Sequence, residues 1–149
     1  MTLVETTTAL KTILVALDGS ELADRVIQTL KELVLPQDIK VIFCHVFTPP
    51  ELGTELPADR PHPESTASSY LHVEKQLQAY QDTLQVKSEL ELVTGEPAEE
   101  IIRLANIYKV DMIVIGSRGL TGMKRIVQGS VSSQVVEEAP CSVLVVKPK

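Results

Sequence analysis

The sequence predicts an α/β protein with a single doubly wound, open sheet of five parallel strands, in the order 3-2-1-4-5, and helices on both faces. Short apolar runs alternate along the chain with segments of helical periodicity. The apolar residues, 44% of the total, are mainly aliphatic and include no Trp, which suits side-chain layers between helices and a sheet. Because 149 residues fit one compact domain, we expect a single domain over residues 1–149, with a polar tail at residues 1–10.

The first strand, the first helix and the second strand follow this tail. Residues 11–17 (KTILVAL) are nearly all apolar and stop at Asp18, as expected of a buried strand that ends in a turn. Ser20 is suited to cap a helix, and Pro36 closes the helical region. Residues 39–47 (IKVIFCHVF) predict a second buried strand. The helix between the strands has one apolar stripe, formed by Ala23, Val26, Ile27, Leu30, Leu33 and Val34.

A proline-rich insertion separates the second strand from the second helix. Five prolines between residues 48 and 69 prevent regular helix over most of this segment, which predicts one long loop. A helix is then predicted to about Gln85, and residues 86–94 predict a third strand. That strand alternates partly between apolar and polar residues, which is typical of a sheet edge. The apolar face of the second helix consists of Tyr70, Val73, Leu77, Tyr80 and Leu84.

The last third of the chain adds two helices and two strands. Pro97 is suited to the first position of a third helix, and residues 111–115 (DMIVI) predict a fourth strand. A short helix from about residue 129 to 138 and a strand at residues 142–146 follow. Parallel strands need helical crossovers, so this alternation implies a parallel sheet covered on both faces. The third helix has an apolar stripe of Ala98, Ile101, Ile102, Ala105 and Tyr108.

Composition narrows the choice of partners. A formal net charge of -6 repels phosphate polymers, and a chain without Trp offers little stacking surface for single strands, so we expect no nucleic acid partner. No apolar stretch approaches the roughly 20 residues of a membrane helix. Residues 1–10 lack the basic start and apolar run of a signal peptide. We therefore expect a cytoplasmic protein without a membrane partner.

Cysteine and histidine residues give little sign of catalysis or metal binding. Cys44 and Cys141 are flanked by apolar residues and have no CxxC partner, which favours buried thiols over redox or metal roles. His45 lies in a predicted buried strand, which favours a core role, and His62 and His72 lack spaced metal partners. No Ser-His-Asp arrangement or HExxH motif is visible in the sequence. This weighs against hydrolytic or metal-dependent catalysis.

Two segments are expected at the carboxyl edge of the sheet, where ligands bind in this class of fold. The first is Asp18-Gly19-Ser20, and the second runs from Gly116 through a glycine-rich stretch to Gly129. Glycine lets backbone N–H groups approach phosphate oxygens, and a helix start adds further free N–H groups. Although the chain is acidic, residues 112–136 contain no Asp or Glu. These features indicate an anion site, although glycines that only make tight turns remain an alternative.

The glycine pattern does not match the two common phosphate motifs but resembles another. GxGxxG does not follow the first strand, and no glycine-rich segment ends in Gly-Lys-Ser/Thr. The spacing Gly116, two residues, Gly119, nine residues, Gly129-Ser130 resembles the ATP-binding signature of the universal stress protein family, in the subgroup that binds ATP. The resemblance covers residues 11–148, including ILVALDGSE, FCHV, TGEPAEEII, VDMIVIGSRG and PCSVLVVK.

The resemblance implies one nucleotide-binding domain and a set of contacts. Ala16, which stands where some members of the family carry proline, and Asp18 would lie at the nucleotide, with Asp18 near the ribose or an ion on the phosphates. Val46 would contact adenine. The cofactor would be ATP, with Mg²⁺ held by the phosphates. The ribose and phosphates would be wrapped by Gly116, Ser117, Arg118, Gly119, Leu120, Thr121 and Gly122, and the phosphate tail held by Gly129, Ser130, Val131 and Ser132.

Three functions are compatible with this reading. The leading hypothesis is an ATP-binding regulatory or stress-sensing protein that is not a dedicated enzyme. A slow ATPase is the first rival, and it would need Asp18, Arg118 or Thr121 to position water at the γ-phosphate. The second is a dimeric interaction module that binds AMP, a cyclic nucleotide or nothing. We also expect a homodimer through the C-terminal edge strand, because an edge of Val and Leu with unpaired backbone groups invites pairing with a second copy. The family resemblance implies the same arrangement, with a tetramer as a further stage.

Overall fold

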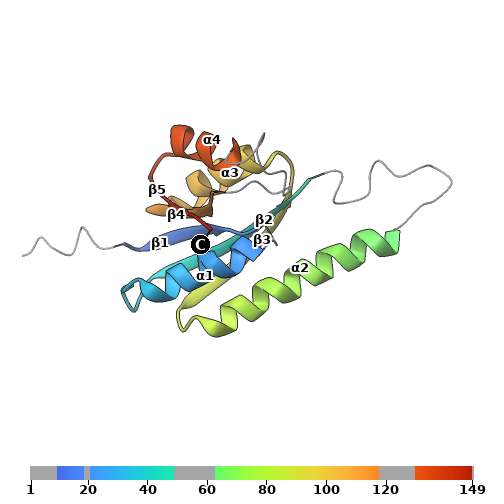
Figure 1. Cartoon of the computed structure of the whole chain (residues 1–149), viewed down its shortest axis with the longest axis horizontal. Coiled ribbons are helices and arrows are strands. Elements are labelled where there is room, and N and C mark those ends of the chain that lie inside the picture. Colours follow the sequence, from blue (N-terminus) through green and yellow to red (C-terminus); the bar gives the residue numbers. More distant parts are fainter. Residues whose placement is uncertain (1–9, 19–20, 49–62, 118–129, 149) are drawn as a thin grey trace, which may run out of the picture.

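The computed structural model describes residues 10–18, 21–48, 63–117 and 130–148, apart from the side chains of Glu21 and residues 63–68. Strands and helices alternate along these segments (Figure 1). In chain order they are β1 (Thr12–Ala16), α1 (Glu21–Glu32), β2 (Lys40–Phe47), α2 (Pro63–Thr83), β3 (Lys87–Thr94), α3 (Pro97–Tyr108), β4 (Met112–Gly116), α4 (Ser130–Glu138) and β5 (Ser142–Val146).

The five strands form one parallel sheet in the order β3-β2-β1-β4-β5, which confirms the predicted topology. β1 lies at the centre, with β2 on one side and β4 on the other. Residues 13–15 of β1 are apolar and buried, because both faces of a doubly wound sheet are covered. Asp111 ties the amino ends of these strands together, since its carboxylate accepts the backbone N–H groups of Lys11 and Thr12 at 2.8 and 3.0 Å.

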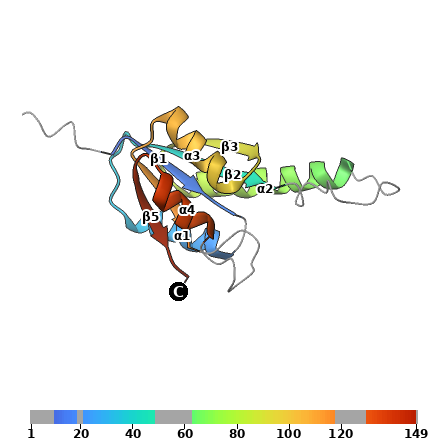
Figure 2. The same ribbon diagram turned by 90° about the horizontal axis from the view of Figure 1, so that it is seen from above.

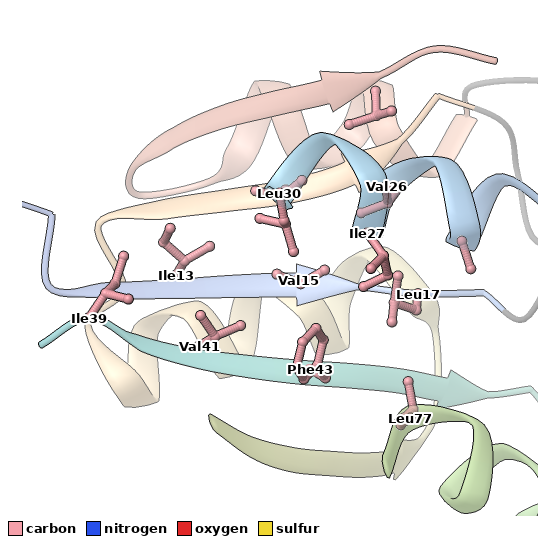
Figure 3. Close-up of a cluster of buried hydrophobic side chains, with 13 residues drawn as sticks. Ile13, Val15, Leu17, Val26, Ile27, Leu30, Ile39, Val41, Phe43 and Leu77 are labelled. Atoms are coloured by element: carbon pink, nitrogen blue, oxygen red, sulfur yellow. The ribbon is translucent and has the colours of Figure 1, made fainter. Parts of the chain in front are cut away.

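Helices cover the sheet on both faces, α1 and α2 on one and α3 and α4 on the other (Figures 1 and 2). Side chains alternate between the two layers along β2. Val41 and Phe43 point into the α1 side, where Figure 3 shows them packed with Val15, Ile27 and other aliphatic side chains. Ile42 and Cys44 belong to the opposite cluster, beneath α3 and α4. The sheet therefore separates two hydrophobic cores.

Two sequence predictions are wrong at the ends of helices, and a third missed a buried residue in the middle of a helix. α2 begins at Pro63, so residues 63–69 of the predicted loop are helical; proline fits there because the first turn needs no intrahelical N–H partner. α1 ends at Glu32, so the last two residues of its predicted stripe fall outside it, and Val34 is fully exposed. In α3 the sequence reading missed Leu104, which is buried, whereas Ile102 is half-buried.

The two edge strands differ in their protection. β3 carries Lys87, Glu89 and Glu91 along its length, and Lys40 of β2 forms an ion pair with Glu89 at 3.0 Å. Charged side chains of this kind discourage pairing with another chain. β5 has Val143, Leu144 and Val145 half-buried at the opposite edge. Among the described residues, no helix is long and apolar enough to cross a membrane.

Candidate functional site

The candidate site lies at the carboxyl edge of the sheet, between the ends of the central strands. From β1 the chain passes to α1 on one face, whereas α3, which leads into β4, lies on the other. The winding direction therefore reverses between β1 and β4, which is where ligands bind in open parallel sheets. The geometry thus favours this edge before any residue type is considered.

A pocket opens at this point, with an empty volume of about 470 Å³ that includes the solvent-open space at its mouth. Strands β1, β2 and β4 supply its floor, and helices α1, α3 and α4 supply its walls. Its lining is Ala16, Leu17, Asp18, Leu22, Ala23, Val26, Cys44, Val46, Pro97, Ile101, Ile115, Gly116 and Val131.

Five residues that the sequence placed at a ligand line this pocket, although they come from separate parts of the chain. Ala16 ends β1 and Asp18 follows two residues later, both half-buried. Val46 is 3% exposed on β2, and Gly116 is the last residue of β4. Val131 reaches the pocket from the first turn of α4. The pocket is apolar, with the Asp18 carboxylate as the charged group in the described part of its lining.

Three predicted residues lie beside the pocket, where β4 meets α4. The backbone N–H of Ser117 donates to the carbonyl of Val146 at 2.9 Å, which extends the pairing of β4 with β5. Ser132 is 6% exposed, and its hydroxyl donates to the carbonyl of Ser117 at 3.4 Å. Ser130 is exposed at the first position of α4. The amino end of α4, with its backbone N–H groups, is thereby held at the mouth of the site.

The remaining predicted site residues lie outside the described residues. They are Arg118, Gly119, Leu120, Thr121, Gly122 and Gly129, together with the Gly19-Ser20 turn.

Gly116 has a packing role that the sequence did not indicate. A Cβ at this position would lie 2.5 Å from Cδ2 and 2.8 Å from Cγ of Leu22 on α1. Carbon atoms pack at about 3.5 to 4.0 Å, so the missing side chain gives Leu22 room to pack against the end of β4. This glycine therefore shapes the α1 wall of the pocket.

Sequence reasoning also missed most of the pocket wall. Leu22, Pro97 and Ile101 line the pocket, but in the sequence they read as helix-start or core residues. The stripe pattern could identify Ile101 as inward-facing, yet it carries no sign that its end of the helix borders a cavity. Only the relative placement of α1 and α3 reveals that.

Cys44 behaves as a buried thiol, as predicted. It is fully buried, and burial, followed by the charge of Glu91, raises the pKa of its thiol to about 12. Cys141 lies one residue before β5 and is half-buried, and burial together with the Asp111 carboxylate raises its pKa. In the described part of the chain, His, Cys, Asp and Glu form no group of three or more that could hold a metal ion.

Residues 9–147 match the universal stress protein family. The chain belongs to this family. A universal stress protein of Thermus aquaticus is 34% identical over 140 residues, which cover 92% of this chain and 98% of that protein. Universal stress protein MJ0531 of Methanocaldococcus jannaschii is 48% identical over a shorter stretch of 62 residues, 42% of this chain and 36% of that protein.

Solved structures show the same fold. The structure of MJ0577, also from Methanocaldococcus jannaschii, is 30% identical, has a TM-score of 0.79, and covers 95% of this chain and 99% of its own. An Arabidopsis thaliana family member with AMP bound is 24% identical, with a TM-score of 0.68 and coverage of 93% and 92%. A member from Archaeoglobus fulgidus in complex with dAMP is 21% identical, with a TM-score of 0.65 and coverage of 92% and 98%.

Proposed function

We propose that this universal stress protein binds ATP in the pocket at the carboxyl edge of its sheet and acts as a nucleotide-dependent regulatory or stress sensor. One observation carries the proposal: the family resemblance assigned Ala16, Asp18, Val46, Gly116 and Val131 to a nucleotide, and all five line one pocket. They lie on or directly after β1, β2, β4 and α4 and come from distant parts of the sequence. Their convergence supports a ligand site.

The chemistry of the pocket suits an adenine nucleotide. Val46 and Ile101 offer an apolar surface to the base. Asp18 accepts hydrogen bonds from ribose hydroxyls or faces a cation on the phosphates. The amino end of α4 presents backbone N–H groups and a partial positive charge to the phosphates. Each part of the nucleotide thus has a matching part of the site.

Mg²⁺ would enter with the phosphates rather than through a protein site. The described residues contain no cluster of ligands that could bind a metal alone, but Asp18 provides a carboxylate at the pocket. Oxygen atoms of phosphates and carboxylates are the ligands Mg²⁺ prefers. When bound, the ion neutralises phosphate charge, which matters because this chain carries a net charge of -6.

Family members of the same fold support adenosine as the common part of the ligand. AMP, dAMP and, in a further solved structure, cAMP are bound by such proteins. We assign ATP to this chain because the glycine spacing from Gly116 to Ser130 resembles that of the ATP-binding subgroup, and because Arg118 adds a positive charge to that segment. A cytoplasmic location fits such a sensor.

A second copy of the chain completes the proposed assembly through β5. The carbonyl of Val146 faces β4, because it accepts the N–H of Ser117. Backbone groups alternate in direction along a strand, so Leu144 also faces β4, while Val143 and Val145 direct their N–H and C=O groups to the open edge. Two such edges related by a two-fold axis pair antiparallel and form a closed dimer, which can pair further into a tetramer.

Two measurements test the nucleotide assignment. Freshly purified protein is denatured, and the released nucleotides are identified by mass spectrometry, with ATP as the expected species. Calorimetry with ATP, ADP and AMP then gives the order of affinity. Protein that carries no nucleotide and binds none of the three would refute the proposal. A steady-state phosphate release within the roughly 1 to 1000 per second of ordinary enzymes, abolished by Asp18→Asn, would replace the sensor with an ATPase.

A further inference from the structure

His45 is a buried histidine beside the pocket. It is 2% exposed and lies on β2 directly before Val46. Its ring nitrogen Nδ1 is 2.9 Å from the carbonyl oxygen of Leu17. A carbonyl oxygen only accepts hydrogen bonds, so Nδ1 carries the proton and donates it. The imidazole is therefore joined to the residue immediately before Asp18.

Residues of β2 hold both the backbone N–H and the backbone C=O of Leu17. Regular pairing of β1 with β2 ends at Ala16 and Cys44. Beyond it, the N–H of Leu17 donates to the carbonyl of Cys44 at 2.9 Å. The carbonyl of Leu17 then meets the side chain of His45. A backbone bond and a side-chain bond thus fix the direction in which the chain leaves the sheet toward Asp18.

Aromatic packing fixes the ring that makes this contact. The edge of one ring faces the other in the His45 and Phe47 pair, with centroids 4.6 Å apart and planes at 73°. Phe47 in turn stacks on Tyr70 of α2, with centroids 5.7 Å apart. Such pairs have preferred geometries, so the imidazole has little freedom to rotate. Its donor therefore stays directed at Leu17.

We propose that His45 is a positioning residue that sets the distance between Asp18 and Val46 across the nucleotide site. Val46 lines the pocket from the opposite face of β2, one residue away, so a single residue step joins the imidazole to the predicted adenine contact. Its hydrogen bond to Leu17 joins it to the predicted ribose contact. The inference rests on the proposed nucleotide function and concerns the adenosine part of the ligand.

Two substitutions distinguish the hydrogen bond of His45 from the packing of its side chain. His45→Asn keeps a donor nitrogen attached to Cγ, at the same step along the side chain as Nδ1, whereas His45→Leu has a similar branched shape without a donor. Loss of one buried hydrogen bond corresponds to about a 3- to 10-fold change in an equilibrium constant. We expect His45→Leu to bind adenosine, AMP and ATP more weakly by this factor, and His45→Asn to stay within about 2-fold of wild type.

Calorimetry well below the melting temperature of each variant gives these affinities, and circular dichroism shows that each is folded. The expected result is that His45→Leu loses affinity for adenosine and for ATP by the same factor, and that His45→Asn keeps nearly the wild-type affinity. Wild-type affinity in His45→Leu, or equal losses in both variants, would overturn the positioning role while leaving the proposed function intact. A wild-type protein that binds no nucleotide would refute the proposed function, and this inference with it.

A spectroscopic measurement on the wild-type protein does not depend on whether the variants fold. Long-range ¹H–¹⁵N NMR distinguishes the two neutral imidazole tautomers. Protonation of His45 at Nδ1 is expected because Leu17 offers only an acceptor. A neutral ring protonated at Nε2 would overturn the inference.

Discussion

Replacing Gly116 with alanine tests whether packing against α1 shapes the end of β4. The new Cβ would lie 2.5 Å from Cδ2 of Leu22, so the leucine side chain must shift to relieve the clash. Extra volume in a packed core costs about 1 to 3 kcal/mol, whereas alanine lowers the entropy of the unfolded chain and so contributes about 0.4 to 1 kcal/mol of stability. We expect the free energy of unfolding to fall by about 1 to 2 kcal/mol.

A double-mutant cycle with Leu22→Ala assigns this loss to one contact. Leu22→Ala alone should cost about 2 to 5 kcal/mol, because it leaves a cavity in the α1 wall. In the double variant the alanine at 116 no longer meets Leu22, so the combined loss should be smaller than the sum by about 1 kcal/mol. Urea denaturation followed by circular dichroism measures all four proteins. Additivity within about 0.5 kcal/mol would refute the reasoning.

Three further predictions concern the glycine-rich segment after Gly116, the half-buried Tyr80 and the proposed dimer. Gly119→Val should abolish ATP binding in calorimetry while the protein stays folded, because a Cβ blocks backbone approach to phosphate. Arg118→Ala should weaken binding less. Unchanged affinity in folded Gly119→Val would remove this segment from the site. The pKa of Tyr80 is raised to about 12. The causes are burial, the hydrogen bond that the Tyr80 hydroxyl donates to Asp24 at 2.6 Å, and the charge of that carboxylate. The contribution of Tyr80 to the free energy of unfolding is therefore complete below the unfolded pKa of about 10 and is lost as pH rises toward 12. An absorbance titration in which Tyr80→Phe removes an ordinary tyrosine transition near pH 10 would contradict this. Val145→Pro should give a folded monomer by light scattering, because it removes an outward N–H, whereas Leu144→Pro should unfold the protein by breaking the ladder to β4; a folded dimeric Val145→Pro variant would place the interface elsewhere.

Periodicity alone predicts much of the fold because each element here buries a definite face. Apolar runs located all five strands to within about one residue, and the predicted strand order agrees with the sheet. Helix ends were less accurate because local signals compete there. Proline opposes helix in general yet starts α2 at Pro63, and the stripe of α1 continues in sequence to Val34 although the helix stops at Glu32.

The site residues at the strand ends could be predicted from the sequence, and Val131 of α4 was assigned by the family resemblance, but the walls formed by α1 and α3 could not be predicted. Asp18 and Gly116 come at the carboxyl ends of β1 and β4, so topology alone brings them together. Leu22 and Ile101 become pocket residues only because α1 and α3 cross the sheet at particular places. The hydrogen bond from His45 to Leu17 joins two residues 28 positions apart, and no local pattern in the sequence indicates it. Contacts of this kind depend on tertiary structure alone.

The position of the pocket would link the proposed nucleotide binding to the stability of the whole fold. Its lining includes Leu17 and Val26 from the core beneath α1 and α2, and Val46 and Ile101 from the core beneath α3 and α4. A ligand in the pocket therefore contacts the ends of both cores, across the central strand that separates them.

Because a ligand that binds only the folded state adds RT ln(1 + [L]/Kd) to the free energy of unfolding, ATP at 100 times its Kd should add about 2.7 kcal/mol. That gain exceeds the loss of stability expected for Gly116→Ala. Saturating ATP should therefore bring this variant to at least the stability of wild type without ATP, unless the displaced Leu22 also blocks the pocket. Measuring the unfolding of wild type and of Gly116→Ala, each with and without ATP, separates these cases. Where ATP stabilises wild type, recovery of the variant shows that the α1 wall can yield, and no recovery shows that Leu22 must keep its place for nucleotide to bind.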